Sequence, residues 1–153
     1  MDRVNLSKAA PELYKTVAEL DQLTMQRIQQ AKIAEGFAHL LKLRASQINQ
    51  CAFCIRMHSH DALKSGETID RIVLLDAWRE CEYFTEKEQA ALILVEEMTL
   101  LAVQHFPEQS YQKAREQLND AEISAIEWIA ITINAWNRIA ISSHYKVSPE
   151  QAK

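Results

Sequence analysis

A short stretch of the chain, residues 51–58, combines two thiols and an imidazole at spacings that suit redox chemistry. It reads CAFCIRMH, so a C-x-x-C pair is followed, four residues later, by a histidine. In a helix of about 3.6 residues per turn, Cys51, Cys54 and His58 share one face, and Asp61 falls on the same side. The residues expected on the opposite, solvent-facing side are Arg56, His60 and Lys64. We therefore expect the reactive trio to face inward and to line a cleft.

The two cysteines and the histidine can complete a thiol redox cycle. Cysteines at i and i+3 of a helix have Cα atoms about 5 Å apart, within the range that a disulfide tolerates. Cys51 lies at the expected helix N-terminus, where free N–H groups favour a thiolate. His58 follows Cys54 by one turn and can accept or return its proton. One thiolate can attack an O–O bond to give a sulfenic acid, which the other thiol resolves to a disulfide.

The same residues leave two other interpretations open. Zinc prefers four ligands, of which Cys51, Cys54 and His58 would supply three, with Asp61 or His39 as the fourth. A single helix face rarely completes a tetrahedron, however, and no second Cys/His pair is visible. The cysteines could instead be buried structural thiols, as we expect for Cys81, which has no partner in the sequence.

Composition indicates one soluble helical domain. The chain has 153 residues, of which 48% are apolar and 25% charged, with two glycines and three prolines. The formal charge of −4 gives no reason to expect nucleic acid or an anionic membrane as a partner. Three cysteines are too few for a secreted disulfide framework, and neither a signal peptide nor a membrane-spanning apolar run is visible. We therefore expect a cytoplasmic, reducing setting.

Apolar periodicity predicts an all-α fold, a single bundle of six or seven helices with a core over about residues 11–141 and a frayed tail from Ser142. Capping-box patterns start two of the helices, at Thr85 and at Asn119, and Gly66 should stop the cysteine helix. The expected helices cover about 11–22 or beyond, 25 or 34 to 49, 51–65, 68–75, 85–104, 107–118 and 123–141.

Residues 40–67 closely resemble the core of alkylhydroperoxidase D-like (AhpD-like) proteins, part of the carboxymuconolactone decarboxylase superfamily. They read LLKLRASQINQCAFCIRMHSHDALKSGE. Weaker matches are Trp78–Arg79 and the segments 84–92 and 133–138, so the resemblance extends over about residues 11–141. It implies an all-α fold that assembles into homo-oligomers, as dimers, trimers or hexamers.

The resemblance also implies an activity, the thiol-dependent reduction of peroxides, with no metal or organic cofactor. Cys54 would attack the peroxide, Cys51 would form the disulfide with it, and His58 would belong to a proton relay. In the best-known branch a lipoyl-bearing protein reduces the disulfide again. Lactone decarboxylation is not implied, because the decarboxylase members do not rely on a C-x-x-C pair.

Two positions depart from that branch. Its relay glutamate lies twelve residues before the first cysteine, where this chain has His39, and its histidine between the cysteines is replaced by Phe53. A histidine at position 39 can also move protons, and Glu35 lies one turn earlier on the same face. The departure at position 39 leaves a second hypothesis open, in which the dithiol is a slow redox switch at a subunit interface.

Overall fold

The computed structural model describes residues 3–149, and within this range the chain is all α-helical and forms a single domain. Six of its nine helices have seven or more residues, and three are short. The helices are α1 (Leu6–Ala9), α2 (Pro11–Gln30), α3 (Glu35–Ile48), α4 (Ala52–Lys64), α5 (Ile69–Val73), the 3-10 helix η1 (Leu75–Glu80), α6 (Glu86–Thr99), α7 (Glu108–Gln117) and α8 (Asp120–Ser142). The all-α prediction is confirmed.

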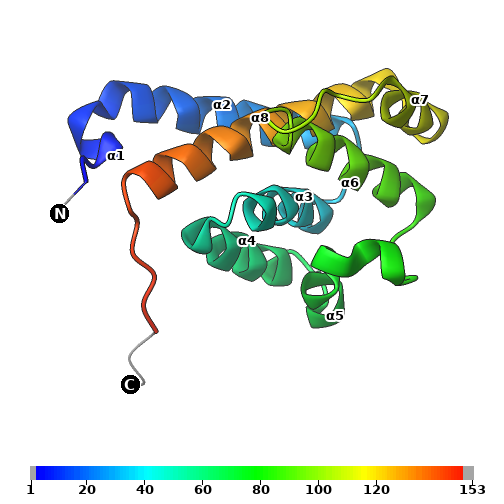
Figure 1. Cartoon of the computed structure of the whole chain (residues 1–153), viewed down its shortest axis with the longest axis horizontal. Helices are drawn as coiled ribbons and strands as arrows, with labels where there is room; N and C mark the ends of the chain where they lie inside the picture. The colour runs from blue at the N-terminus through cyan, green and yellow to red at the C-terminus, as the bar shows by residue number, and fades with distance from the viewer. Residues whose placement is uncertain (1–2, 150–153) are drawn as a thin grey trace.

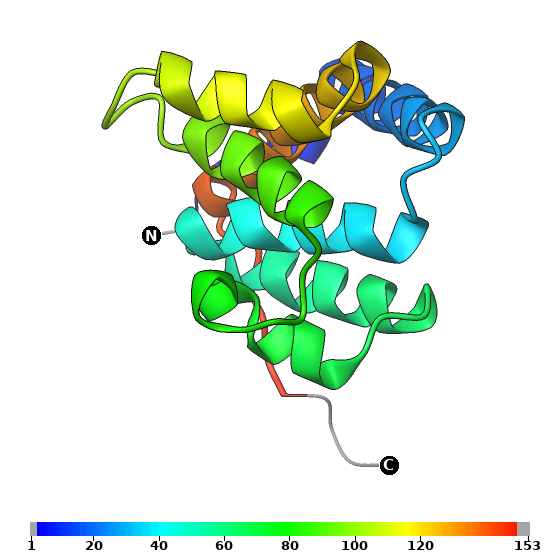
Figure 2. The same ribbon diagram turned by 90° about the vertical axis from the view of Figure 1, so that its right-hand side faces the viewer.

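Helix α3 is the centre of the bundle. It contacts α2, α4, α6, α8 and η1, and Figures 1 and 2 show it with α4 alongside it and the long helices α2 and α8 on its other side. Its side chains Leu40, Leu41 and Leu43 are almost completely buried for this reason. Burial of three leucines contributes on the order of 5–9 kcal/mol of hydrophobic free energy before entropic costs. The side chains on the flanks of α3 are therefore held in fixed positions.

Local capping explains where several helices begin and end. Thr85 and Asn119 form the two predicted capping boxes, with the Glu88 and Glu122 side chains accepting from the cap N–H groups at 2.9 and 3.0 Å. Thr68 caps α5. Gly66 follows α4 with φ of +93°, a conformation that glycine adopts without strain.

Helix boundaries differ from the sequence prediction at three places. Helix α2 continues to Gln30, because Thr24 and Ile28 extend its buried stripe, and this excludes residue 25 as the start of the next helix. Helix α6 ends at Thr99, and the following Leu101 and Val103 are exposed, so the segment up to 104 has no apolar face to bury. Before residue 11, where no helix was predicted, the chain forms α1, whose N–H groups are capped by the Asn5 side chain.

The C-terminal segment stays against the body of the protein as far as it is described. After α8 ends, residues 143–149 are not helical, yet Arg56 donates to the Ser148 carbonyl at 2.9 Å and Tyr145 packs against the cysteines. The rest of the tail that we expected to be frayed, residues 150–153, lies outside the described residues.

A buried carboxylate ties α3, η1 and α6 together. Glu96 accepts from Arg44 and Arg79 at 2.7 Å and from the Trp78 indole at 2.9 Å. Burial by itself raises the pKa of Glu96, but these three donors outweigh it and lower the pKa. Arg44, Arg79 and Trp78 hold three helices together through Glu96, so we assign this carboxylate to the packing of the fold and not to a functional site.

Candidate functional site

The cysteine pair lies at the N-terminus of α4, as the sequence predicted. Cys51 is the N-cap residue, and its sulfur accepts from the Cys54 backbone N–H at 3.4 Å. The two cysteines form a disulfide with a Cα–Cα separation of 5.3 Å, close to the expected helical spacing. Both residues are only 2% exposed. The N-terminal peptide dipoles of α4 therefore act on these sulfurs in a largely dry environment.

The predicted orientation of α4 is also confirmed. Cys54, His58 and Ala62 are buried, whereas the side chains opposite them are exposed. The exposed residues are Arg56, His60 and Lys64. His58 therefore faces the interior one turn after Cys54.

The structure brings His39 of α3 against His58 of α4. Their Nδ1 atoms are 3.4 Å apart, and the two rings stack with centroids 5.6 Å apart and planes inclined by 28°. Asp61 completes a cluster in which one ligand-capable atom from each of the three residues lies within 4.8 Å of the others. The sequence suggested His39 or Asp61 as a fourth zinc ligand. Both lie beside His58, but neither cysteine belongs to this cluster.

The hydrogen bond between the two rings fixes their tautomers relative to each other. We assign the His39 proton to Nε2, because this nitrogen lies on the side of Glu35, whose carboxylate oxygen is 4.0 Å away, beyond hydrogen-bond distance but close enough to favour the proton electrostatically. The Nδ1 atom of His39 then accepts from the Nδ1–H of His58. As a result Nε2 of His58 carries a bare lone pair, and this atom is buried without a hydrogen-bond partner among the described residues.

Both histidines are held neutral. Burial is the main reason that the pKa of His58 falls to about 3, and Lys42 and His39 lower it further. Burial and Lys42 likewise lower the pKa of His39, against the opposing influence of Asp61, Glu35 and Asp21. Lys42 is itself buried and paired with Asp21 at 2.8 Å. At neutral pH each ring can therefore offer a lone pair.

The cleft expected in front of the trio is only partly present. A pocket of about 200 Å³ is lined by Cys51, Phe53 and Tyr145, with the two aromatic rings in edge contact at 5.1 Å. Neither Cys54 nor His58 lines this pocket. With the disulfide closed, Cys51 is the member of the pair that lines this opening.

Two features of the site were not visible in the sequence. Lys42 was missed, although it lies three residues after His39 and so on the same face of the helix. The contact of Tyr145 with the cysteines was missed because it depends on the path of the chain after α8. Cys81 is free and half-buried, donating to the Trp78 carbonyl at 3.4 Å, away from the pair.

The zinc site made of Cys51, Cys54 and His58 is not supported by this geometry. The two sulfurs are joined in a disulfide, and the described group with metal-ligand spacing contains no cysteine.

Within residues 3–149 no helix is both long and apolar enough to span a bilayer.

The buried neutral His58 predicts a pH-dependent stability. Between about pH 6.5 and 3 the unfolded chain binds a proton at this residue that the folded chain does not, so the free energy of unfolding falls as pH is lowered. The slope is at most about 1.4 kcal/mol per pH unit for one proton. Replacing His58 by Gln should flatten the profile measured by urea unfolding of the oxidised protein from pH 7.5 to 4. The exposed His60→Gln variant is the matched control, and equal slopes in wild type and His58→Gln would contradict the assignment.

Comparison with known proteins agrees with the fold and with the motif. The model of the carboxymuconolactone decarboxylase family matches residues 11–97, which include α4 and both site histidines. The uncharacterised protein YdfG of Bacillus subtilis (strain 168) is 39% identical over 140 residues, covering 92% of each chain. A solved structure from Agrobacterium tumefaciens, described as a protein of unknown function and a candidate antioxidant defence protein AhpD, superimposes with a TM-score of 0.88. It is 36% identical, and the match covers 98% of this chain and 100% of that one. The chain therefore belongs to the carboxymuconolactone decarboxylase family and has the AhpD-like fold.

Proposed function

We propose that the protein is a thiol-dependent peroxidase of the alkylhydroperoxidase kind, acting in the reducing, cytoplasmic setting that its cysteine content favours. The observation that carries this proposal is the disulfide-forming pair at the N-terminus of α4 with the unpartnered Nε2 of His58 one turn further along. A dithiol that closes to a disulfide stores two electrons, and a peroxide requires two electrons to become an alcohol and water.

The cycle balances with the residues present. The Cys54 thiolate attacks the outer oxygen of ROOH, the O–O bond breaks, and the alkoxide takes a proton to leave as ROH. Cys54 becomes a sulfenic acid, which the Cys51 thiolate attacks, so that water departs and the disulfide forms. An external dithiol, in the resemblance a lipoyl-bearing protein, then reduces the pair. Cys51 lines the pocket whereas Cys54 does not, so in this proposal the reductant attacks the sulfur of Cys51.

His58 and His39 supply the proton transfers. In the tautomer described above, the bare Nε2 of His58 accepts the Cys54 proton, while Nδ1–H can pass toward His39 and Glu35 beyond it. The strongly lowered pKa of His58 belongs to the oxidised protein, where no thiolate is present. A Cys54 thiolate one turn away favours the imidazolium, so reduction raises the proton affinity of the ring when it is needed.

The cysteine roles predict a clear order among serine variants. Cys54→Ser should abolish peroxide consumption, because no nucleophile remains to be oxidised. Cys51→Ser should allow one turnover to a sulfenic acid and then stop, since no resolving thiol is left. Steady-state peroxide consumption with a dithiol reductant measures Cys54→Ser, whereas Cys51→Ser is measured in a single turnover without external thiol, with thiols counted before and after. Cys81→Ser serves as the matched control. Normal turnover by Cys54→Ser would overturn the proposal.

The relay predicts graded effects along the proton path. Positioned acid–base groups contribute about 10²–10⁴-fold in rate. We expect His58→Gln to lower kcat by about 10²-fold or more, His39→Gln by less, and Glu35→Gln by only a few-fold because its carboxylate is largely exposed. The control is again His60→Gln. A His58→Gln variant with the wild-type pH–rate profile would remove His58 from the relay.

A second function, a redox switch, is favoured by one observation. The disulfide is packed against Ala140 at the end of α8 and against Tyr145, so opening it affects the C-terminal segment directly. Such a device would report oxidation without efficient turnover.

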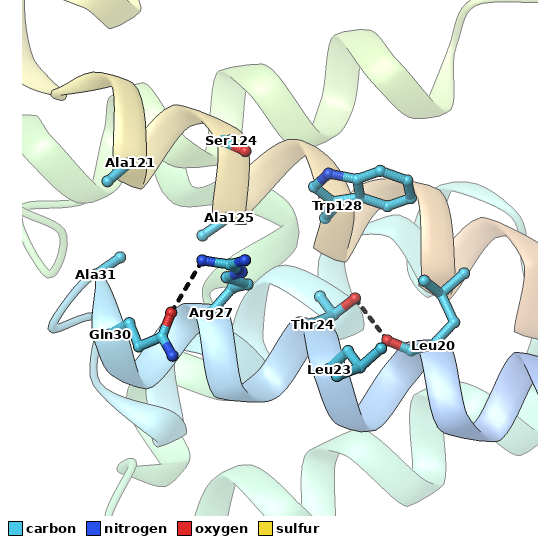
Figure 3. Close-up of a pocket in the computed structure, with 10 residues that line it drawn as sticks. All are labelled: Leu20, Leu23, Thr24, Arg27, Gln30, Ala31, Ala121, Ser124, Ala125 and Trp128. Atoms are coloured by element: carbon cyan, nitrogen blue, oxygen red, sulfur yellow. Dashed lines mark hydrogen bonds between the residues drawn. The ribbon is translucent and has the colours of Figure 1, made fainter.

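The oligomeric state with and without reductant distinguishes the peroxidase from the redox switch. We propose that the chain forms homo-oligomers, dimers, trimers or hexamers, consistent with the exposed Leu23 and Trp128 beside a pocket of about 470 Å³ between α2 and α8 (Figure 3). Sedimentation with and without reductant should give the same mass for a peroxidase. A redox-dependent mass together with negligible peroxide turnover would favour the switch.

A further inference from the structure

We propose that His39, His58 and Asp61, called here the His–His–Asp cluster, form a binding site for a divalent transition metal ion of the zinc class, and that this ion competes with proton transfer by His58. The cluster joins two helices, because His39 lies on α3 while His58 and Asp61 lie three residues apart on one face of α4. Two imidazoles and one carboxylate are ligands that zinc accepts.

The distances suit a metal ion of this size. Zinc–nitrogen bonds are about 2.0–2.1 Å, so two ligands of a tetrahedral zinc are about 3.4 Å apart. The Nδ1 atoms of His39 and His58 are 3.4 Å apart, which leaves room for an ion to bridge them in place of the shared proton. The carboxylate lies within 4.8 Å of the other ligand atoms and needs to move by about 1 Å. Asp61 is half-buried, and its long 3.9 Å ion pair with Lys64 leaves it able to do so.

The surroundings supply the outer shell that zinc-bound histidines use. With Nδ1 of His39 on the metal, the Glu35 carboxylate 4.0 Å from Nε2 is the nearby acceptor, and it would have to approach by about 1 Å to make the hydrogen bond that orients such ligands. The nearby ammonium group of Lys42 would repel a dication, but Asp21 pairs with it at 2.8 Å. Counting Glu35, Asp61, Asp21 and Lys42, the local charge is negative and favours a cation.

Metal binding changes what His58 can do. In the metal-free protein the buried Nε2 has no hydrogen-bond partner within residues 3–149, and it carries the lone pair in the tautomer assigned above. A metal on Nδ1 moves that proton to Nε2, so the nitrogen that serves as a base becomes a donor. The cluster thus either moves protons or holds an ion, and the second state leaves the dithiol without its base. This last step rests on the proposed relay, whereas the binding itself does not.

Binding is tested on a chain that lacks the competing thiols. In Cys51→Ser/Cys54→Ser protein, Zn²⁺ titrated by calorimetry should bind with one site per chain, and Co²⁺ should give a spectrum of nitrogen and oxygen ligation without sulfur charge transfer. Adding His39→Gln or Asp61→Asn should weaken binding at least tenfold, whereas adding the exposed His60→Gln should not change it. Circular dichroism confirms that each variant is folded, and the partly exposed Asp61 provides a variant that leaves the core intact.

Two results would overturn the site. One is the absence of saturable binding in the double serine protein, and the other is binding that is indifferent to both His39→Gln and Asp61→Asn. Competition with the relay is measured separately, as slower peroxide oxidation of the wild-type thiols in Zn²⁺ that a chelator reverses. Asp61→Asn should require at least tenfold more Zn²⁺ for the same slowing. Equal sensitivity of the two proteins would assign the inhibition to zinc on the cysteines and overturn the competition.

Discussion

Packing of α3 against α4 is the constraint on which the site depends. The cysteines and His58 come from one helix, and their relative placement follows from helical geometry alone. The 3.4 Å approach of His39 to His58 does not, because it requires two helices to be held in one register. That register is fixed by the burial of α3 among five other elements and by the Glu96 network that anchors Arg44 of α3 to η1 and α6.

Burial then decides the chemistry of the paired rings. An imidazole in water is partly charged near neutrality, whereas the desolvated rings of His39 and His58 stay neutral. Lys42 reinforces this effect from within the core, and its own cost of burial is offset by Asp21. In the tautomer assigned above, the neutral pair shares one proton between its facing nitrogens and leaves Nε2 of His58 bare, so the proposed relay runs from His58 toward Glu35.

Sequence patterns were sufficient wherever the structure is local. The C-x-x-C spacing, the inward face of α4 and both capping boxes depend on residues within one or two turns, so periodicity predicted them correctly. The end of α6 was misplaced because it is decided by whether Leu101 and Val103 find a surface to cover. Helical spacing placed Asp61 on the face of His58, and the resemblance suggested His39 for the relay, but the direct contact of the His39 and His58 rings depends on how α3 packs against α4. Nothing local distinguishes a histidine at position 39 that meets another ring from one that packs against aliphatic side chains, and the burial of Lys42 follows only from the arrangement of α2 and α3.

In the proposed relay, the residue at position 39 is a histidine in place of the glutamate of the best-known branch. A glutamate at this position would act as a carboxylate directly on His58, whereas His39 places an imidazole there and leaves the carboxylate to Glu35, one turn earlier on α3. The carboxylate at the end of the proposed relay therefore belongs to Glu35, whose side chain is largely exposed, and not to a residue in the interior. An imidazole pair carries no net charge at rest, so the buried site avoids the desolvation of an anion. Two neutral nitrogens that face each other also form a pair of ligands that a glutamate could not provide, so under the two proposals this substitution makes proton transfer and metal binding alternatives at one place in the fold.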